Sequence, residues 1–384
     1  MTRIAIVTEI PAPFRIPLFN ALASTDGVEL SVQFLAASDP RRSYPVYADE
    51  FHFPWEVLPG HDVLARGRWV VLNRGVGRAL SRADAEVVVL GGWNQPAFWS
   101  AQRWAGRNGR KTAAWVESTA RDARSNAPVL ERAKRRFLRR CDAFIVPGRA
   151  SAEYIASFGA EGQIAVAPNA VDGAIFGERV AAARERRREL REELGIERDC
   201  ILYVGRLVPE KGVDLLVGAL AENPSCELIV AGEGPERARL AALATDVAPG
   251  RIRFLGYVAR DDIPPWYAAA DVFALPSRSE QWGMVLNEAV TAGLPLVASD
   301  AAGGAHDLVD DGNNGFVVPA GDGAALAGAL TRLLRDTALR ERGAARSLEI
   351  ARGFTPAAWA GAVAALASDL SGSPPQGGKL SSST

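Results

Sequence analysis

Short apolar runs of strand length alternate with helical runs along the chain, and this alternation occurs in two series. Strands of a buried parallel sheet are covered on both faces, so they appear as continuous apolar runs. The first series predicts strands at residues 3–8, 29–35, 86–90, 112–116 and 143–146, with helices that include 16–23 and 97–108. Strands that alternate with helices predict a doubly wound parallel sheet, whose ligands bind beyond the carboxyl ends of the strands.

A second series follows a charge-dense helix predicted at residues 178–194. Its expected strands are 201–204, 227–231, 251–255, 271–275, 296–299 and 315–318, and its last helices are 324–334, 337–351 and 356–370. A chain of 384 residues exceeds a single hydrophobic core, so we predict two domains, residues 1–172 and 173–355, with the boundary near Gly173. The expected fold is α/β, with two Rossmann-like β/α/β domains that face a cleft.

The composition is that of a globular protein, with 48% apolar and 23% charged residues. No run approaches the roughly 18 apolar residues of a membrane span, and the first residues predict a strand rather than a signal peptide. Three widely spaced cysteines form no metal motif and indicate free thiols in a reducing cytoplasm, where we expect the protein to reside. Residues 371–384 have the composition of a flexible tail.

The charge is unevenly distributed, although the net charge is only −1. Residues 1–172 hold 22 basic and 17 acidic side chains, whereas residues 173–384 hold 22 and 28. Together with a basic helix at residues 131–140, this excess suggests a weak peripheral contact with an anionic membrane surface. A solvated helix face is the favoured alternative, because only Phe137 and Leu138 supply an apolar stripe.

Residues 276–295 carry two glutamates, Glu280 and Glu288, on either side of Gly283. A helix is predicted to begin just after this glycine, which puts Glu280 in the preceding loop and Glu288 in the first or second turn. A phosphate or diphosphate binds readily at such a helix start. The amides expected to point at it include those of Gly283, Met284 and Val285. An anion site with a carboxylate on each side predicts a ligand with both phosphates and hydroxyls.

Three further turns follow predicted strands of the second series. Residues 204–212 (VGRLVPEKG) contain Arg206 and Lys211, whose charges suit phosphate oxygens. The other two turns, around Gly234 and up to Val258, are each a common connection when taken alone. We include them as candidates for the site because they occur in this order between Arg206 and Glu280.

These segments together resemble the retaining glycosyltransferases of family 4, which have the GT-B fold. The pattern Pro-Ser-x-x-Glu-x-x-Gly-x-x-x-x-Glu-Ala-x-x-x-Gly-x-Pro and the three turns cover most of residues 200–320 in the expected order. The resemblance implies that the turn with Gly234 is the family's Gly-x-Gly turn and that the segment ending at Val258 meets the nucleotide base. It also implies that a final helix, residues 356–370, crosses back to the first domain.

The resemblance further implies a metal-independent transferase that moves a hexose-type sugar from a nucleoside diphosphate sugar to an acceptor hydroxyl, with retention. Arg206 and Lys211 would neutralise the leaving diphosphate. Glu288 would bind the ribose hydroxyls, and Glu280 would hold donor-sugar hydroxyls beside the reacting carbon.

The first half departs from the family pattern. Where many members have a Gly-Gly loop at the diphosphate, residues 9–15 (EIPAPFR) contain two prolines, which cannot donate backbone N–H groups. Arg15 would replace those amides or remain a solvated helix residue, and its neighbour Phe14 is expected on the acceptor side. Where many members have a histidine, Glu117 and Ser118 follow a predicted strand. Glu117 is therefore a candidate to orient the acceptor hydroxyl or take its proton, with a surface carboxylate as the alternative.

The expected partners are a nucleoside diphosphate sugar donor and a small-molecule, lipid-linked or glycan acceptor, with no nucleic acid and no separate cofactor. The sequence contains no Asp-x-Asp triplet of the kind that metal-dependent single-domain transferases use. Two alternatives stay open: a nucleotide-sugar epimerase of related fold and a non-catalytic nucleotide-sugar binding protein. Acceptor-dependent release of the nucleoside diphosphate would distinguish the transferase from both.

Overall fold

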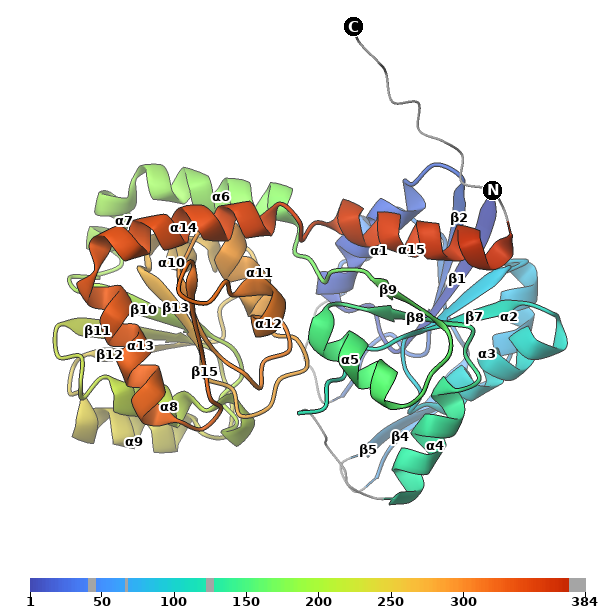
Figure 1. Cartoon of the computed structure of the whole chain (residues 1–384), viewed down its shortest axis with the longest axis horizontal. Coiled ribbons are helices and arrows are strands. Elements are labelled where there is room, and N and C mark those ends of the chain that lie inside the picture. The colour runs from blue at the N-terminus through green and yellow to red at the C-terminus, as the bar shows by residue number, and fades with distance from the viewer. Residues whose placement is uncertain (41–45, 66–67, 122–127, 373–384) are drawn as a thin grey trace, which may run out of the picture.

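Most strands belong to two parallel sheets, in two lobes that lie side by side (Figure 1). The computed structural model describes residues 1–40, 46–65, 68–121 and 128–372. The predicted α/β fold with two Rossmann-like domains is confirmed.

The first lobe is built on a seven-stranded parallel sheet with the strand order β3-β2-β1-β6-β7-β8-β9. Its strands are β1 (Thr2–Thr8), β2 (Val28–Phe34), β3 (Trp55–Val57), β6 (Val87–Leu90), β7 (Lys111–Trp115), β8 (Ala143–Val146) and β9 (Gln163–Val166). In β1, β6 and β7 the register places Val7 opposite Leu90 and Leu90 opposite Ala114. The residues that follow these three strands therefore meet at one edge of the sheet.

Helices cover both faces of this sheet. They are η1 (Pro13–Arg15), α1 (Ile16–Ala23), η2 (Ala48–Glu50), α2 (Val76–Arg82), α3 (Pro96–Arg107), α4 (Pro128–Leu138) and α5 (Arg149–Ser157). An antiparallel hairpin of β4 (Gly60–Ala65) and β5 (Arg68–Asn73) was not predicted from the sequence. It packs on the same lobe through the buried side chains of Trp69 and Val71.

The second lobe has a six-stranded parallel sheet with the order β12-β11-β10-β13-β14-β15. The strands are β10 (Asp199–Val204), β11 (Cys226–Ala231), β12 (Ile252–Gly256), β13 (Val272–Leu275), β14 (Leu296–Ser299) and β15 (Gly315–Val318). The strand order reverses between β10 and β13. Ligands of such sheets bind beyond the carboxyl ends of the strands at this reversal.

The helices of the second lobe depart from the sequence analysis at one place, where two helices replace a single predicted one. They are α6 (Gly173–Glu185), α7 (Arg187–Glu193), η3 (Pro209–Lys211), α8 (Val213–Ala219), α9 (Arg237–Val247), α10 (Pro264–Ala269), α11 (Met284–Thr291), α12 (Ala305–Leu308), α13 (Gly323–Arg335) and α14 (Thr337–Ala351). The single helix predicted at 178–194 is wrong, because the structure has two helices with a break at Arg186. Arg187 and Arg191 turn toward Asp271, at 2.7 Å and 3.0 Å, and these ion pairs set the direction of α7.

The last helix, α15 (Pro356–Ser371), lies on the first lobe beside α1, although α14 before it covers the second lobe (Figure 1). It begins at Thr355, whose hydroxyl accepts the Ala358 amide at 3.1 Å, and Pro356 suits the first helical position. Trp359 is fully buried in the core of the first lobe. The expected return of the final helix to the first domain is confirmed.

Candidate active site

Two loops at the strand reversal of the second sheet hold a partly buried ion pair. Lys211 ends the loop after β10, and Glu280 lies in the loop after β13. The Lys211 ammonium contacts the Glu280 carboxylate, and the two side chains are only 14% and 17% exposed. The structure thus brings together two of the predicted site residues that are 69 positions apart.

The backbones of these two loops are fastened to each other. The amide of Arg278 donates to the Glu210 carbonyl at 2.7 Å, and the Arg278 guanidinium holds Asp214 through bonds of 2.7 Å and 2.8 Å. Gly212 has a φ of +64°, and a Cβ there would lie 2.3 Å from the Pro276 carbonyl oxygen. The close approach of the loops therefore requires glycine at this position.

The turn with Gly234 packs against the loop that carries Arg206. The Leu207 amide donates to the Glu233 carbonyl at 2.8 Å, and a Cβ on Gly234 would lie 2.2 Å from the Leu207 carbonyl oxygen. Gly234 thus supports the loop through its backbone. The Arg206 side chain is exposed, and it makes no hydrogen bond or ion pair with the described residues. Arg206 therefore lies on the predicted loop but outside the Lys211–Glu280 contact.

Helix α11 begins where the sequence predicted, directly after Gly283, which has φ +90°. The amide of Leu286 donates to the Gly283 carbonyl at 2.8 Å. Within the described residues, the amides of Met284 and Val285 have no hydrogen-bond acceptor. These two amides lie at the positive end of the helix dipole, four and five residues after Glu280. They can therefore donate hydrogen bonds to an anion bound there.

Glu288 lies on α11 and lines a cavity of about 450 Å³ between the lobes. Its carboxylate accepts a hydrogen bond of 2.6 Å from Tyr267. Burial raises the pKa of the Glu288 carboxyl from about 4.5 to about 7, and the Tyr267 hydrogen bond opposes this rise. Phe14 of the first lobe and Tyr257, next to Val258, line the same cavity, whereas Val258 itself packs on the core of the second lobe.

The raised pKa of Glu288 predicts a pH-dependent effect of Glu288→Gln. A folded-state pKa above the unfolded value gives stability that is full below about pH 4.5 and is lost as pH rises through 7. Glutamine keeps an acceptor for Tyr267 but cannot ionise. We therefore expect Glu288→Gln to raise Tm relative to the parent protein more at pH 8.5 than at pH 5.0. The exposed control Glu222→Gln should show no such difference, and an equal effect of Glu288→Gln at both pH values would contradict the explanation.

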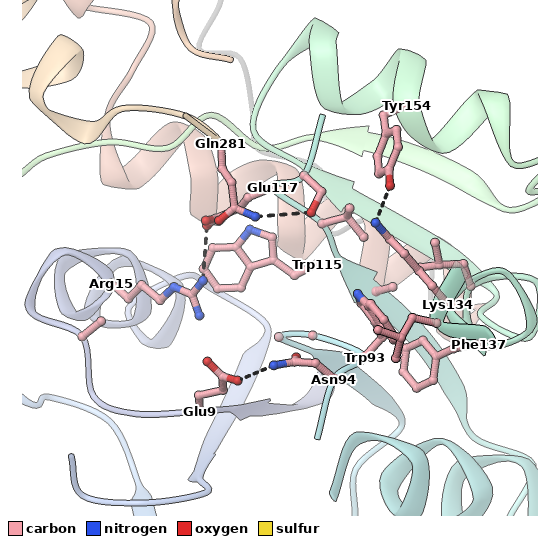
Figure 2. A pocket seen from close by; sticks show the side chains of 18 of the residues that line it. Glu9, Arg15, Trp93, Asn94, Trp115, Glu117, Lys134, Phe137, Tyr154 and Gln281 are labelled. Carbon is pink, nitrogen blue, oxygen red and sulfur yellow. Dashed lines mark hydrogen bonds and ion pairs between the residues drawn. The ribbon is translucent and has the colours of Figure 1, made fainter. Parts of the chain in front are cut away.

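A second cavity, of about 350 Å³, lies at the edge of the first sheet (Figure 2), and we call it the acceptor-side cavity. Arg15 donates to the Thr8 hydroxyl at 2.8 Å and to the Glu117 carboxylate at 3.3 Å, and it lies 4.3 Å from the centre of the Trp115 ring. The structure thus pairs two residues that were predicted separately. Phe14 lines both cavities, so this cavity and the interlobe cavity are neighbours.

One hydrogen bond links the acceptor-side cavity to the second lobe. The Gln281 amide donates to the Ser118 hydroxyl at 3.3 Å, and Gln281 directly follows Glu280 (Figure 2). The predicted residues of the two lobes are therefore connected through Ser118. Gln281 was not predicted as a site residue, although its place beside Glu280 was a usable signal.

Several other cavity residues were also missed by the sequence analysis. Those with polar or aromatic side chains are Glu9, Trp93, Asn94, Glu131, Lys134 and Tyr154. Asn94 follows β6 as Glu117 follows β7, and a polar side chain after a strand was the only local signal for it.

Trp282, in the same loop as Glu280 and Gln281, does not line this cavity. It is 3% exposed and its indole N–H donates to Asn287 at 2.7 Å, so it packs beneath the loop.

Within residues 1–40, 46–65, 68–121 and 128–372, no group of three or more His, Cys, Asp or Glu side chains could hold a metal ion. None of the helices in the described part is both long and apolar enough to traverse a bilayer.

Two family models match successive parts of the chain. The model of the glycosyl transferases group 1 matches residues 186–347, and that of glycosyltransferase family 4 matches residues 20–174. The chain is 39% identical over 168 residues to α-D-kanosaminyltransferase of Streptomyces kanamyceticus, covering 42% of this chain and 43% of that protein. It is 38% identical over 236 residues to D-inositol 3-phosphate glycosyltransferase of Xylanimonas cellulosilytica, covering 59% and 55%. The chain thus spans about half the length of these relatives.

Solved structures share the fold over the whole chain. The HepE structure from Anabaena in complex with UDP has a TM-score of 0.78 at 23% identity, covering 96% of this chain and 100% of that chain. WaaG, a glycosyltransferase involved in lipopolysaccharide biosynthesis, has a TM-score of 0.67 at 21% identity, covering 96% and 100%. The two family models divide the chain as its two lobes do, and the protein therefore belongs to the family 4 glycosyltransferases with the GT-B fold.

Proposed function

We propose that the protein transfers a hexose-type sugar from a nucleoside diphosphate sugar to an acceptor hydroxyl, with retention of configuration and without a metal ion. The observation that carries this proposal is the partly buried Lys211–Glu280 pair at the strand reversal of the second sheet. It lies near the first two amides of α11, which have no acceptor within the described residues, and is linked to the acceptor-side cavity through Gln281 and Ser118. A diphosphate, a donor sugar and an acceptor can thus meet at one point.

The second lobe would hold the donor. Lys211, Arg206 and the first amides of α11 supply positive charge for the diphosphate oxygens, which is the role that a metal ion has in other transferases. Glu280 accepts hydrogen bonds from sugar hydroxyls, and Glu288 accepts them from the ribose. In the absence of a donor, Glu280 keeps the Lys211 ammonium at the position that the diphosphate would occupy.

The first lobe would present the acceptor. The anomeric C–O bond to the diphosphate breaks, and a bond from the same carbon to the acceptor oxygen forms on the same face. The acceptor proton passes to a departing diphosphate oxygen or to Glu117, whose carboxylate is held by Arg15 at 3.3 Å. Positioning and charge stabilisation, rather than a covalent sugar intermediate, then account for the rate.

The donor site can be tested by binding alone. UDP and GDP at millimolar concentration should each be tried, and one of them is expected to raise Tm of the full chain by several degrees. The matching nucleoside monophosphate should give a much smaller shift, because it lacks the phosphate that faces Lys211. Equal shifts for the diphosphate and the monophosphate would contradict the proposed diphosphate site.

The reaction itself is tested with donor sugars of the base that binds. The expected result is acceptor-dependent release of the nucleoside diphosphate that persists in EDTA. An α-linked donor should give an α-linked product by NMR. Interconversion of the donor sugar without an acceptor would indicate an epimerase, and a β-linked product would exclude retention.

A further inference from the structure

The acceptor-side cavity contains one carboxylate whose position is set by a network of amides. Glu9 follows β1, and its Oε1 accepts a hydrogen bond from Asn94 at 2.8 Å (Figure 2). The same oxygen accepts a hydrogen bond from Gln95 at 3.1 Å. The Glu9 backbone carbonyl accepts the Ala36 amide at 3.0 Å. Both the backbone and the side chain of Glu9 are therefore held in place.

Gln95 connects Glu9 to the hairpin of the first lobe. Its side chain is 1% exposed, accepts the Val71 amide at 2.9 Å and donates to the Trp69 carbonyl at 3.1 Å. Each polar atom of the Gln95 amide thus has a partner, which fixes the amide orientation. Asn94 and Gln95 both bond Glu9 Oε1. None of the described residues bonds the second carboxylate oxygen, Oε2.

The charges of the cavity are not balanced. Three glutamates, Glu9, Glu117 and Glu131, line it with two cations, Arg15 and Lys134. Arg15 pairs with Glu117, whereas no cation of the described residues pairs with Glu9 or Glu131. Carboxylates in a partly enclosed site are costly without a counter-charge, so a cationic ligand would be stabilised there.

The second cation of the cavity, Lys134, does not favour an anionic ligand. Lys134 is 6% exposed, and its ammonium donates to the Tyr154 hydroxyl. It also lies 4.4 Å from the centre of the Tyr154 ring and 5.5 Å from that of Phe158. These contacts already satisfy the Lys134 ammonium, so it is not free to pair with an anionic ligand. The first half of the sequence has an excess of basic residues, but the side chains that line this cavity do not.

The size and the walls of the cavity limit the ligand further. A volume of about 350 Å³ is at the lower end for small-molecule sites and suits one sugar-sized ring rather than a lipid chain. Trp93 and Tyr154 offer aromatic surface to the apolar face of such a ring. We propose that the acceptor is an aminated sugar or cyclitol ring and that Glu9 Oε2 binds its ammonium group. This inference depends on the proposed function, because it names the acceptor of the same reaction.

The test compares rings that differ only in the charged group. Binding of glucosamine, galactosamine and mannosamine to the full chain is measured at pH 6.5 against glucose, galactose, mannose and glucose 6-phosphate. At least one amine is expected to bind about tenfold or more tightly than its parent sugar, because a hydrogen bond between charged groups adds that much. Equal binding of every amine and its parent, or tightest binding of the phosphate ester, would overturn the proposal.

Glu9→Gln keeps the shape of the side chain and its bonds to the two amides but removes the charge. The preference for the amine should then fall to about twofold or less, while Tm and the Tm shift with the nucleoside diphosphate stay unchanged. The matched control Glu29→Gln, at an exposed position on β2, should keep the full preference. A preference that survives in Glu9→Gln would exclude Glu9 as the ammonium ligand. Nucleoside diphosphate binding without any amine preference would refute only this inference, whereas loss of both would refute the proposed function as well.

Discussion

Lys211→Ala is expected to lower the rate of sugar transfer at least about a hundredfold. The partly buried Lys211 ammonium contacts the Glu280 carboxylate and lies where the proposed mechanism places the leaving diphosphate. Removing one preorganised donor to a developing negative charge typically costs a factor of 10² to 10³ in turnover. The measurement is the initial rate of nucleoside diphosphate release at saturating donor. A rate within about tenfold of the parent would remove Lys211 from the proposed mechanism.

The control for this substitution is Lys111→Ala. Lys111 also forms an ion pair with an acidic side chain, Asp142, at 3.2 Å, but it lies on β7 away from both cavities and is 48% exposed. Loss of an exposed pair costs about 0–1 kcal/mol in stability, so its rate should stay near that of the parent. The comparison separates the loss of a lysine ion pair from the loss of a catalytic charge.

Glu280→Ala should produce a loss of similar size, and the two substitutions should not be additive. Because Lys211 and Glu280 contact each other, each single change also alters the partner. The double variant is therefore expected to be only slightly slower than the slower single variant. A double variant whose loss equals the product of both single losses would mean that the two residues act independently.

The second lobe could largely be predicted from the sequence because its information is local. Strands such as β13 and β14 are buried on both faces and appear as apolar runs. The start of α11 at Gly283 follows from a glycine that has a positive φ before a helical run. Residues matched by family resemblance, such as Lys211 and Glu280, lie on loops directly after such strands.

The acceptor-side cavity could not be predicted in the same way because it depends on strand order. Glu9 and Asn94 are 85 positions apart and meet only because β1 and β6 are neighbours in the sheet. Nothing in either segment specifies that pairing. The Arg15–Glu117 pair, 102 positions apart, has the same origin. The sequence supplied these two residues as separate candidates, and the sheet makes them partners.

The break at Arg186 was missed for a related reason. The local sequence favours one continuous helix, since charged residues with good helix propensity run through it. The ion pairs of Arg187 and Arg191 with Asp271, which lies about 80 residues later in the chain, outweigh that preference. A tertiary contact of this kind leaves no local pattern.

Trp359→Ala is expected to lower the free energy of unfolding by about 3–5 kcal/mol, because a large, fully buried side chain is removed from the core. The Trp359 ring lies 6.1 Å from that of Phe19 on α1 and 5.1 Å from that of Trp115 on β7. It therefore provides much of the contact between α15 and the first lobe. The change is measured by urea unfolding followed by tryptophan fluorescence and circular dichroism.

The matched variant is Trp359→Phe. The Trp359 indole N–H has no hydrogen-bond partner in the described part of the chain, so phenylalanine removes no polar contact and keeps most of the packing. Its loss should stay well below that of alanine. A loss under about 1 kcal/mol for Trp359→Ala itself would mean that α15 is not docked as described.

The same substitution should also affect the acceptor side. Trp115, which packs on Trp359, lies 4.3 Å beneath the Arg15 guanidinium that holds Glu117. At a temperature where the variant remains folded, we expect Trp359→Ala to raise the KM for the acceptor more than the KM for the donor. Helix α15 is thus expected to support the acceptor site through Trp115, and equal changes in both KM values would restrict its role to stability.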